Sequence, residues 1–354
     1  MRHTLVVMTL RYQKETVNVK SKKEEWSMEN IIQKKIGEIK FGDIQLHNHV
    51  AVMPIIGGDD AVWPYLTMKE AMDGHFLIVT EVTEDGSVPE LKVQNRADKP
   101  VLLLDGEELA GAKQNRVLNT TILLRENSET IIPVSCTEHG RWSYRSANFE
   151  ESGYMMSAKL RGVKNESVHE NLKRLQIFRS NQGAVWDEIE YQARANKVQA
   201  STGAMRDILE AKKEDMDSYL EHFPLVPDQS GLLVIMNSEV VGMDMISGKQ
   251  AFAQLHPKLI KSYVMDSLTV KPKKGNQHYR SKADAFLGNI IHCKESVFDS
   301  VGYGQDYRYE GNNMVGSALV HAGIVIHLAF FQVTGAEKSG HMSSVSRRRM
   351  YRTN

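Results

Sequence analysis

Residues 101–124 read VLLLDGEELAGAKQNRVLNTTILL, and residues 131–142 read IIPVSCTEHGRW. In both segments, short runs rich in Val, Ile and Leu enclose or precede a dense set of charged and amide side chains. Short apolar runs bounded by Gly, Asp and Asn are typical of buried β-strands. The two segments therefore predict strands that carry many polar groups, and these groups are the first candidates for a functional site.

Apolar runs of the same kind recur throughout the N-terminal half of the chain. The predicted strands cover residues 36–44, 50–56, 76–83, 91–94, 101–104, 117–124 and 131–134. Clusters of Gly and Asp, such as 57–60 and 84–86, separate them, because these residues tolerate the backbone angles of tight turns. Short strands at this spacing predict a sandwich-like or barrel-like arrangement.

Beyond residue 153 the apolar period becomes helical. Val168, Leu172 and Leu175 share one helical face, and this spacing continues until Pro224 and Pro227 end it. The middle of the chain is therefore predicted to be helical.

The C-terminal part has a mixed pattern. We expect a hairpin of residues 232–236 and 240–246, joined at Asn237-Ser238. A helix capped by Ser247 should run to residue 268, and a short helix should follow Ser281. The closing strands are predicted at 295–300, 314–320 and 324–333. The whole pattern indicates an α+β protein: a β-rich sandwich-like or barrel-like N-terminal half, a helical middle, and a mixed C-terminal part whose strands can return to the first sheet.

Four regions are expected along the chain. They are a poorly patterned N-terminal extension (1–27), a β-rich region that carries the motif (28–150), an α+β region (151–334) and a basic, disordered tail (335–354). The boundary between the second and third regions is placed near 149–153. The tail contains Arg347, Arg348, Arg349 and Arg352 without an apolar face, so we expect it to be solvated.

The composition limits the class of partner and compartment. Lys plus Arg and Asp plus Glu both number 44, so no global field attracts nucleic acid or an anionic membrane. No apolar stretch approaches the roughly 18 residues of a membrane span, and the apolar run near the N-terminus is too short for a secretion signal. Two cysteines are too few for a disulfide framework. We therefore expect a cytoplasmic protein without a nucleic-acid or membrane partner.

Three carboxylates follow the strand at 101–104. Asp105-Gly106 is a strong signal for a tight type I′ turn, in which both residues would be purely structural. On a strand, Asp105 and Glu107 would share one face and Glu108 the other, so the three should not all be buried. Glu107 and Glu108 are the candidate catalytic residues, because paired carboxylates serve acid/base chemistry or hold a ribose diol or a cation. The alternative is that both glutamates are ordinary strand residues that face solvent and have no catalytic role.

Amides and cations come next, and they are candidate ligand-binding residues: Lys113, Gln114, Asn115, Arg116 and Asn119. Lys113 and Arg116 are three positions apart and could clamp phosphate oxygens. A salt bridge to the preceding glutamates is at least as good an explanation.

The second segment adds Glu138, Arg141 and Trp142 to the candidate ligand-binding residues. Trp142 beside Arg141 could stack on a base, or could pack beneath a loop. Cys136 is near His139, but we interpret it first as a small core residue and only then as a nucleophile. His47 and His49 could share a strand face, yet no further ligands are evident, so no metal site is predicted. The common nucleotide and hydrolase fingerprints are absent, and no cofactor or oligomeric state is indicated.

The strings LDGEELAGAKQNRVLNTTILL, PVSCTEHGRW and GLLVIMNSEVVGMDMIS, taken in order, resemble the ARG and Rhodanese-Phosphatase-superfamily-associated protein domain family. The similarity runs from about Met28 to about Val333. The family takes its name from association with ADP-ribosylglycohydrolases and rhodanese or phosphatase domains, so the resemblance implies a place in NAD or ADP-ribose metabolism. The residues that match its motif are Asp105, Gly106, Glu107, Glu108, Gly111, Lys113, Gln114, Asn115, Arg116, Asn119, Cys136, Glu138, Gly140, Arg141 and Trp142.

Two functions from different classes follow. The first is binding or processing of a nucleotide-like ligand, NAD-derived or containing ADP-ribose, with cations for the pyrophosphate and Glu107 or Glu108 as a general base. The second is a non-catalytic sensor or interaction module whose polar residues form a structural salt-bridge network. A thiol enzyme that uses Cys136 ranks below both.

Overall fold

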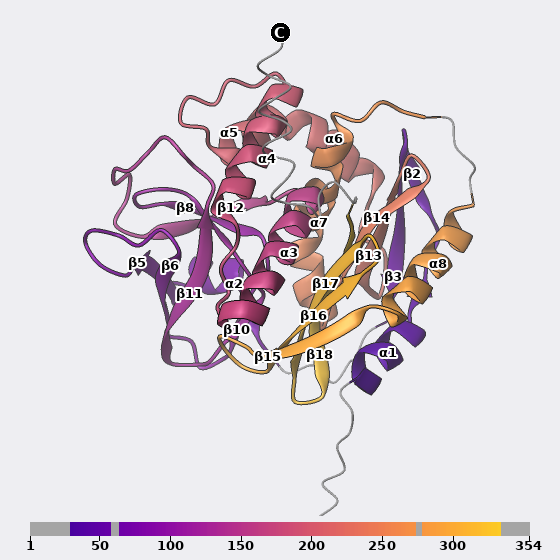
Figure 1. Ribbon diagram of the computed structural model, residues 1–354, viewed down its shortest axis with the longest axis horizontal. Helices are drawn as coiled ribbons and strands as arrows, with labels where there is room; N and C mark the ends of the chain where they lie inside the picture. Colours follow the sequence, from indigo (N-terminus) through magenta and orange to yellow (C-terminus); the bar gives the residue numbers. More distant parts are fainter. Residues whose placement is uncertain (1–28, 58–63, 274–277, 334–354) are drawn as a thin grey trace, which may run out of the picture.

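The computed structural model describes residues 29–57, 64–273 and 278–333. The expected N-terminal extension and basic tail lie outside these residues. Figure 1 shows a barrel and a large sheet, separated by a layer of helices.

The large sheet contains nine strands, and all neighbours are antiparallel. Its order is β1 (Lys40–Phe41), β3 (Val50–Ile56), β13 (Gln229–Met236), β14 (Glu239–Ile246), β18 (Ile324–Gln332), β17 (Met314–His321), β16 (Gln305–Gly311) and β15 (Lys294–Asp299), with β2 (Gln45–His47) also paired to β3. Early and late strands therefore share one sheet, as the sequence pattern allowed.

Both faces of this sheet are buried. On β3, Val50 and Val52 face a core shared with α3 (Ala158–Leu175) and α7 (Lys249–Ser267), while Ala51 and Met53 face α1 (Glu29–Gly37) and α8 (Tyr279–Ile291). This alternation follows from the period of two in a strand. Because each face is covered by helices, the strand sequence reads as a continuous apolar run.

The barrel is a closed ring of six strands. Their order is β11 (Ser128–Cys136), β6 (Glu90–Asn95), β5 (Leu77–Glu81), β12 (Phe149–Met155), β8 (Glu107–Gly111) and β9 (Arg116–Leu118), which pairs with β11 again. Apolar side chains such as Leu109, Leu118 and Val134 fill its interior. A small sheet of β10 (Ile122–Leu124), β7 (Val101–Leu103) and β4 (Leu66–Thr67) adjoins it, followed by α2 (Met68–Asp73).

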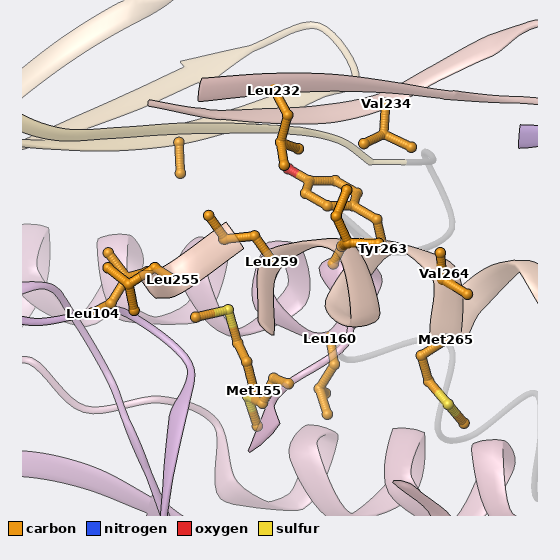
Figure 2. Packing of buried hydrophobic residues seen from close by; sticks show 14 of the residues in the cluster. Leu104, Met155, Leu160, Leu232, Val234, Leu255, Leu259, Tyr263, Val264 and Met265 are labelled. Atoms are coloured by element: carbon orange, nitrogen blue, oxygen red, sulfur yellow. The ribbon is translucent and has the colours of Figure 1, made fainter. Parts of the chain in front are cut away.

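The helical layer joins the barrel to the sheet. Figure 2 shows Leu259 and Tyr263 of α7 facing Leu232 and Val234 of β13, with Met155 and Leu160 on the opposite side of the helix. The remaining helices, α4 (Gln182–Ala195), α5 (Met205–Ala211) and α6 (Lys213–His222), extend this layer over one end of the barrel and sheet (Figure 1). One of three clusters of buried apolar residues therefore packs the helical layer against the large sheet on one side and the barrel on the other.

The α+β class, the barrel and the helical middle are confirmed, but several elements differ from expectation. Residues 36–44 do not form one strand, because Ile32 and Ile36 lie four apart on the buried face of α1. The run 117–124 is two strands in different sheets. The polar segment between them bonds elsewhere, with Asn119 Nδ2 donating to the carbonyl of Phe178. Strands β8, β12 and β16 were not predicted, because polar residues interrupt their patterns.

The hairpin of β13 and β14 is confirmed, including its turn. Asn237 and Ser238 both have positive φ, 49° and 65°, as a type I′ turn requires. The predicted cap at Ser247 is wrong: the cap position of α7 is Gly248 and no side chain bonds there. Ser281 lies inside α8 rather than before it. His47 and His49 flank a turn at Asn48, whose φ is 52°, so they do not share a strand.

Residues 149–153, where a regional boundary was expected, form part of β12 in the barrel. Within the residues that the structure describes, no helix combines the length and the apolar character needed to cross a membrane.

Candidate functional site

Strand register places a polar group at one end of the barrel interior. Arg116 lies opposite Leu109 on one neighbouring strand and opposite Cys136 on the other. Directly opposed residues point to the same face of a sheet, and Leu109 belongs to the barrel core, so all three face inward. Glu81 lies opposite Leu91, another core residue, and also faces inward. We use the name barrel mouth for the polar residues at this end together with their neighbours: Glu81, Lys113, Gln114, Arg116, Cys136 and Trp142.

Arg116 is the unusual member of the barrel mouth, because it is fully buried and forms no ion pair among the described residues. Glu81 and Glu138 attract its guanidinium only at longer range. Its Nη1 donates to Gln114 Oε1 at 3.1 Å and to the carbonyl of Asn115 at 3.4 Å. Its Nε and Nη2 have no hydrogen-bond partner within the part of the chain that the structure describes. Burial lowers the pKa of this guanidinium. A buried charge without a counterion costs free energy, so this arrangement is more suited to a ligand than to stability.

Gln114 connects Arg116 to Cys136. Its Oε1 also accepts from Cys136 Sγ at 3.1 Å, and its Nε2 donates to the carbonyl of Glu138 at 2.8 Å. Burial raises the pKa of the Cys136 thiol, although Arg116 opposes this effect. The interpretation of Cys136 as a buried core residue is confirmed.

Aromatic rings cover the barrel mouth. Arg116 Cζ lies 5.8 Å from the centroid of the Trp142 ring, and Lys113 Nζ lies 5.4 Å from Trp142 and 5.0 Å from Tyr144. Trp142 and Tyr144 are 48% and 52% exposed, so they can move without disrupting a core. Gly86, with φ of 78°, leaves no room for a side chain: a Cβ there would approach Lys113 Cδ to 3.1 Å. The loop at Gly86 is therefore packed closely against this cover.

Glu138 and Arg141 form a closed pair beside the mouth. Arg141 Nη2 donates to Glu138 Oε2 at 2.6 Å, and Arg141 Nη1 donates to the carbonyls of Ala112 and Ser143. Burial opposes ionisation of Glu138, but hydrogen bonds from Arg141, Thr202 and the Asn115 amide outweigh it and lower its pKa. These contacts tie the segment after β11 to the loop between β8 and β9.

Glu107 lies apart from this group. Its Oε1 accepts from Lys258 Nζ of α7 at 2.5 Å, and its Oε2 accepts from the amide of Leu104 at 2.8 Å. Lys258 also pairs with Glu151 at 2.6 Å. Glu107 is thus held in an ion-paired group between the barrel and α7, and it does not meet Arg116, Glu138 and Arg141 in one cleft.

Glu108 faces the opposite side of β8 from Leu109. Thr137 Oγ1 donates to its Oε1 at 3.1 Å, and its Oε2 has no partner in the described structure. Burial raises its pKa to about 7. Asn119 contacts a different set of residues, and Ser135 Oγ donates to its Oδ1 at 2.6 Å.

The expectation that the three carboxylates cannot all be buried is wrong, since Asp105, Glu107 and Glu108 are at most 2% exposed. Both sides of this segment are covered by other elements, and each carboxylate meets different partners. The Asp105-Gly106 turn is real, but only Gly106 has a positive φ, so it is not a type I′ turn. It also connects strands of two different sheets rather than a hairpin.

Asp105 belongs to a buried ion network that sequence reasoning missed. Lys164 Nζ donates to Asp105 Oδ1. Arg161 binds Asp244 through two hydrogen bonds of 3.0 and 2.6 Å, and Asp244 also meets His327 Nε2 at 3.1 Å. A signal was present: Arg161 and Lys164 occupy the same helical face as the buried Val168. Two cations on a buried face require acidic partners, although the sequence does not show which.

The family model described as ARG and Rhodanese-Phosphatase-superfamily-associated Protein domain matches residues 38–331. No curated protein and no solved structure is detectably similar to the chain.

Proposed function

The chain belongs to the ARG and Rhodanese-Phosphatase-superfamily-associated Protein domain family, and we propose that it binds an NAD-derived or ADP-ribose-containing ligand at the barrel mouth. The observation that carries this proposal is Arg116, a fully buried guanidinium with two nitrogens that have no partner. The ligand class comes from the context that the family implies. The position agrees with a general preference of ligands for the mouths of β-barrels.

The two free N–H groups define the chemistry of the ligand. Nε and Nη2 lie on one edge of the guanidinium, and this edge matches two oxygens of a phosphate or carboxylate. Hydrogen bonds there would be strong, since the surroundings are shielded from water. Lys113 adds a second positive charge next to the same indole. A pyrophosphate fits this pair of cations.

The aromatic cover supplies the second feature of a nucleotide site. Bases stack on exposed indole and phenol rings, and such stacking contributes about 1–3 kcal/mol per base. Trp142 and Tyr144 are both half exposed and both contact Lys113, so they offer such surfaces at the mouth. We assign direct ligand contact to Lys113, Arg116 and Trp142.

The remaining motif residues would act by holding these three in place. Gln114 orients Arg116, and the Glu138–Arg141 pair fixes the loop through Asn115 and three backbone carbonyls. Most polar groups of the motif therefore form a paired network, as expected for the alternative of a non-catalytic sensor or interaction module, and Arg116 and Lys113 are the groups that this network leaves for a ligand. Ligand binding without an assigned reaction is the function that the geometry supports best.

A hydrolytic step is the second candidate, and one observation favours it. Glu108 has a pKa of about 7 and an oxygen without a partner, which are properties of a general base. Glu107 is the weaker choice for this role, because Lys258 holds its carboxylate as an ion pair.

The proposal is tested by calorimetric titration with ADP-ribose, NAD and AMP. We expect binding to the wild-type protein and a loss of at least about tenfold in affinity for Arg116→Met, as for removal of a buried charge partner. Arg96→Met is the matched control, because Arg96 is exposed and bonds only Gln94. The absence of binding at millimolar ligand, or equal affinities for both variants, would contradict the proposal. Turnover that survives Glu108→Gln would remove the general-base role.

A further inference from the structure

A cavity lies outside the barrel, between α4 and the loop that follows it. Its volume is about 740 Å³, within the roughly 300–1,000 Å³ of small-molecule sites. The lining residues are His139, Gly183, Trp186, Asp187, Ile189, Glu190, Ala193, Arg194, Val198, Gln199, Ala200 and Gly203. We call it the α4 pocket. His139 is the only lining residue that comes from the two motif segments quoted at the outset.

Both walls of the α4 pocket are attached to the end of β11. On the helix side, Gln182 accepts from the amide of Cys136 and donates to its carbonyl, each at 2.8 Å. On the loop side, Thr202 Oγ1 donates to Glu138 Oε1 at 2.9 Å, and the Gly140 amide donates to the Thr202 carbonyl at 2.7 Å. The pocket is therefore held open by fixed contacts rather than formed by a loose loop.

Gly140 shows how closely the loop that contains Thr202 packs against the segment after β11. A Cβ at position 140 would lie 3.1 Å from the backbone of Thr202. Glu138 also forms an isolated β-bridge with Ala204. The motif residues Glu138 and Gly140 thus build the pocket wall, which gives them a role that ligand contact at the barrel mouth does not explain.

The floor of the α4 pocket is aromatic. The ring of His139 meets the indole of Trp186 edge to face, with centroids 4.4 Å apart and an interplanar angle of 82°. Ile189, Ala193 and Val198 add apolar surface. Planar rings pack well against such surfaces, because offset and edge-to-face aromatic contacts add about 0.5–1.5 kcal/mol to the burial of area.

The charged lining favours ligands that are neutral or positive. Asp187 and Glu190 contribute two acidic groups and Arg194 one basic group, and Arg194 already pairs with Glu190. An excess of negative charge at a pocket rim attracts cations and disfavours anions. The barrel mouth has the opposite preference, since it has two cations, Arg116 and Lys113, and one carboxylate, Glu81.

We propose that the α4 pocket is a binding site for a planar heteroaromatic ring that is neutral or positively charged. This site is separate from the anion site at Arg116. The two share a boundary, because Gln182, the first residue of α4, bonds both backbone groups of Cys136, which lies in the barrel mouth.

The test uses three small rings of similar shape and different charge: nicotinamide, 1-methylnicotinamide and nicotinate. Binding to the full chain is measured by ligand-observed NMR titration. Nicotinate is titrated into the Arg116→Met variant, because its carboxylate matches the free edge of Arg116 in the wild-type protein. We expect 1-methylnicotinamide and nicotinamide to bind, and nicotinate to bind this variant at least about tenfold more weakly. No binding of any ring at millimolar concentration, or equal binding of nicotinate, would overturn the proposal.

Two variants locate the binding. Ala200→Phe fills the pocket from its loop side, where the backbone need not change, and should abolish binding of all three rings. Asp187→Asn should reduce the affinity for 1-methylnicotinamide to that for nicotinamide. Arg116→Met should bind nicotinamide and 1-methylnicotinamide, which have no carboxylate, as the wild type does. This result separates the α4 pocket from the proposed function. Ring binding that persists in Ala200→Phe, or that is lost in Arg116→Met, would contradict a separate α4 pocket site.

Discussion

Two arginines of this chain, Arg161 and Arg116, are buried to the same extent but have opposite surroundings. Both are 0% exposed. Arg161 binds Asp244 through two hydrogen bonds and lies 3.8 Å from Asp105, and after the cost of burial these carboxylates raise its pKa. Arg116 bonds only an amide oxygen and a carbonyl, and burial lowers its pKa. Ion pairs within the fold offset the free-energy cost of burying Arg161, whereas no ion pair among the described residues offsets it for Arg116.

The difference reflects where each arginine lies. Arg161 is on α3, between the turn at Asp105 beside the barrel and strand β14 of the large sheet. Its ion pairs therefore join three parts of the molecule. Arg116 faces the barrel interior at its mouth, where the ring of Trp142 lies over it and Glu81 attracts it without forming an ion pair in the described structure. The first region holds the fold together, and the second is available to a ligand.

The largest effect is expected at the paired arginine. Arg161→Met leaves Asp244 and Asp105 buried with less compensation, and removal of one partner of a buried pair costs about 3–5 kcal/mol. Urea unfolding should show this loss, whereas Arg174→Met on the exposed side of the same helix should change the free energy of unfolding by less than about 0.5 kcal/mol. Equal free energies of unfolding for Arg161→Met and Arg174→Met would contradict the conclusion that the ion pairs of Arg161 stabilise the fold.

Lys258 tests whether the loss of a buried ion-pair partner destabilises the protein at other sites as well. Lys258→Met leaves Glu107 and Glu151 close together without their shared cation, so we expect a loss of about 3 kcal/mol at neutral pH. Because the two carboxylates can be protonated, the deficit relative to wild type should shrink when unfolding is measured at low pH. A deficit that is independent of pH would indicate lost packing instead of lost charge pairing.

Glu108 provides a buried carboxylate that forms no ion pair among the described residues, although Arg206 attracts it at longer range. Burial raises its pKa from 4.5 to about 7, so the folded state prefers the neutral form. The stability that this group contributes is complete below pH 4.5 and is lost as the pH rises towards 7. Glu108→Gln should therefore be more stable than wild type by about 2–3 kcal/mol at pH 8 and equal to it at pH 4. Parallel stability curves for the two proteins would refute the raised pKa.

The smallest effect on stability is expected at the unpaired arginine. Arg116→Met removes a buried charge that has no ion pair, and replacement of buried charges by apolar groups is often neutral, so the change should stay within about 1 kcal/mol. The same variant should lose ligand affinity, as described above. A large destabilisation with unchanged binding would mean that Arg116 serves the fold.

The local patterns predicted a large part of the architecture. Period two at 50–56 and the hairpin at Asn237-Ser238 predicted strands and a turn that the structure contains. Helical spacing at Val168 and Leu172 predicted α3. These predictions succeed because strand and helix periods arise from the backbone itself, and the core positions follow them.

The prediction of the candidate site succeeded less well. The motif string placed Lys113 and Arg116 close together, because the loop between β8 and β9 is short, but Trp142 follows β11 and meets them only in the fold. The string also placed Glu107 and Glu108 on opposite sides of a strand, but it could not show which elements each of them meets. Nor could it find Lys164, Arg161 or Lys258, whose partners come from other parts of the chain.

The sequence by itself determined the class of fold, the motif and the membership of the family. Only the tertiary structure decided which charges are paired. Lys164 meets Asp105 across 59 positions, and Arg161 meets Asp244 across 83. The free energy of a buried charge depends on the groups within a few ångströms in space, and distance along the chain does not reveal them. For this reason the unpaired state of Arg116, on which the proposed function rests, became visible only in the folded protein.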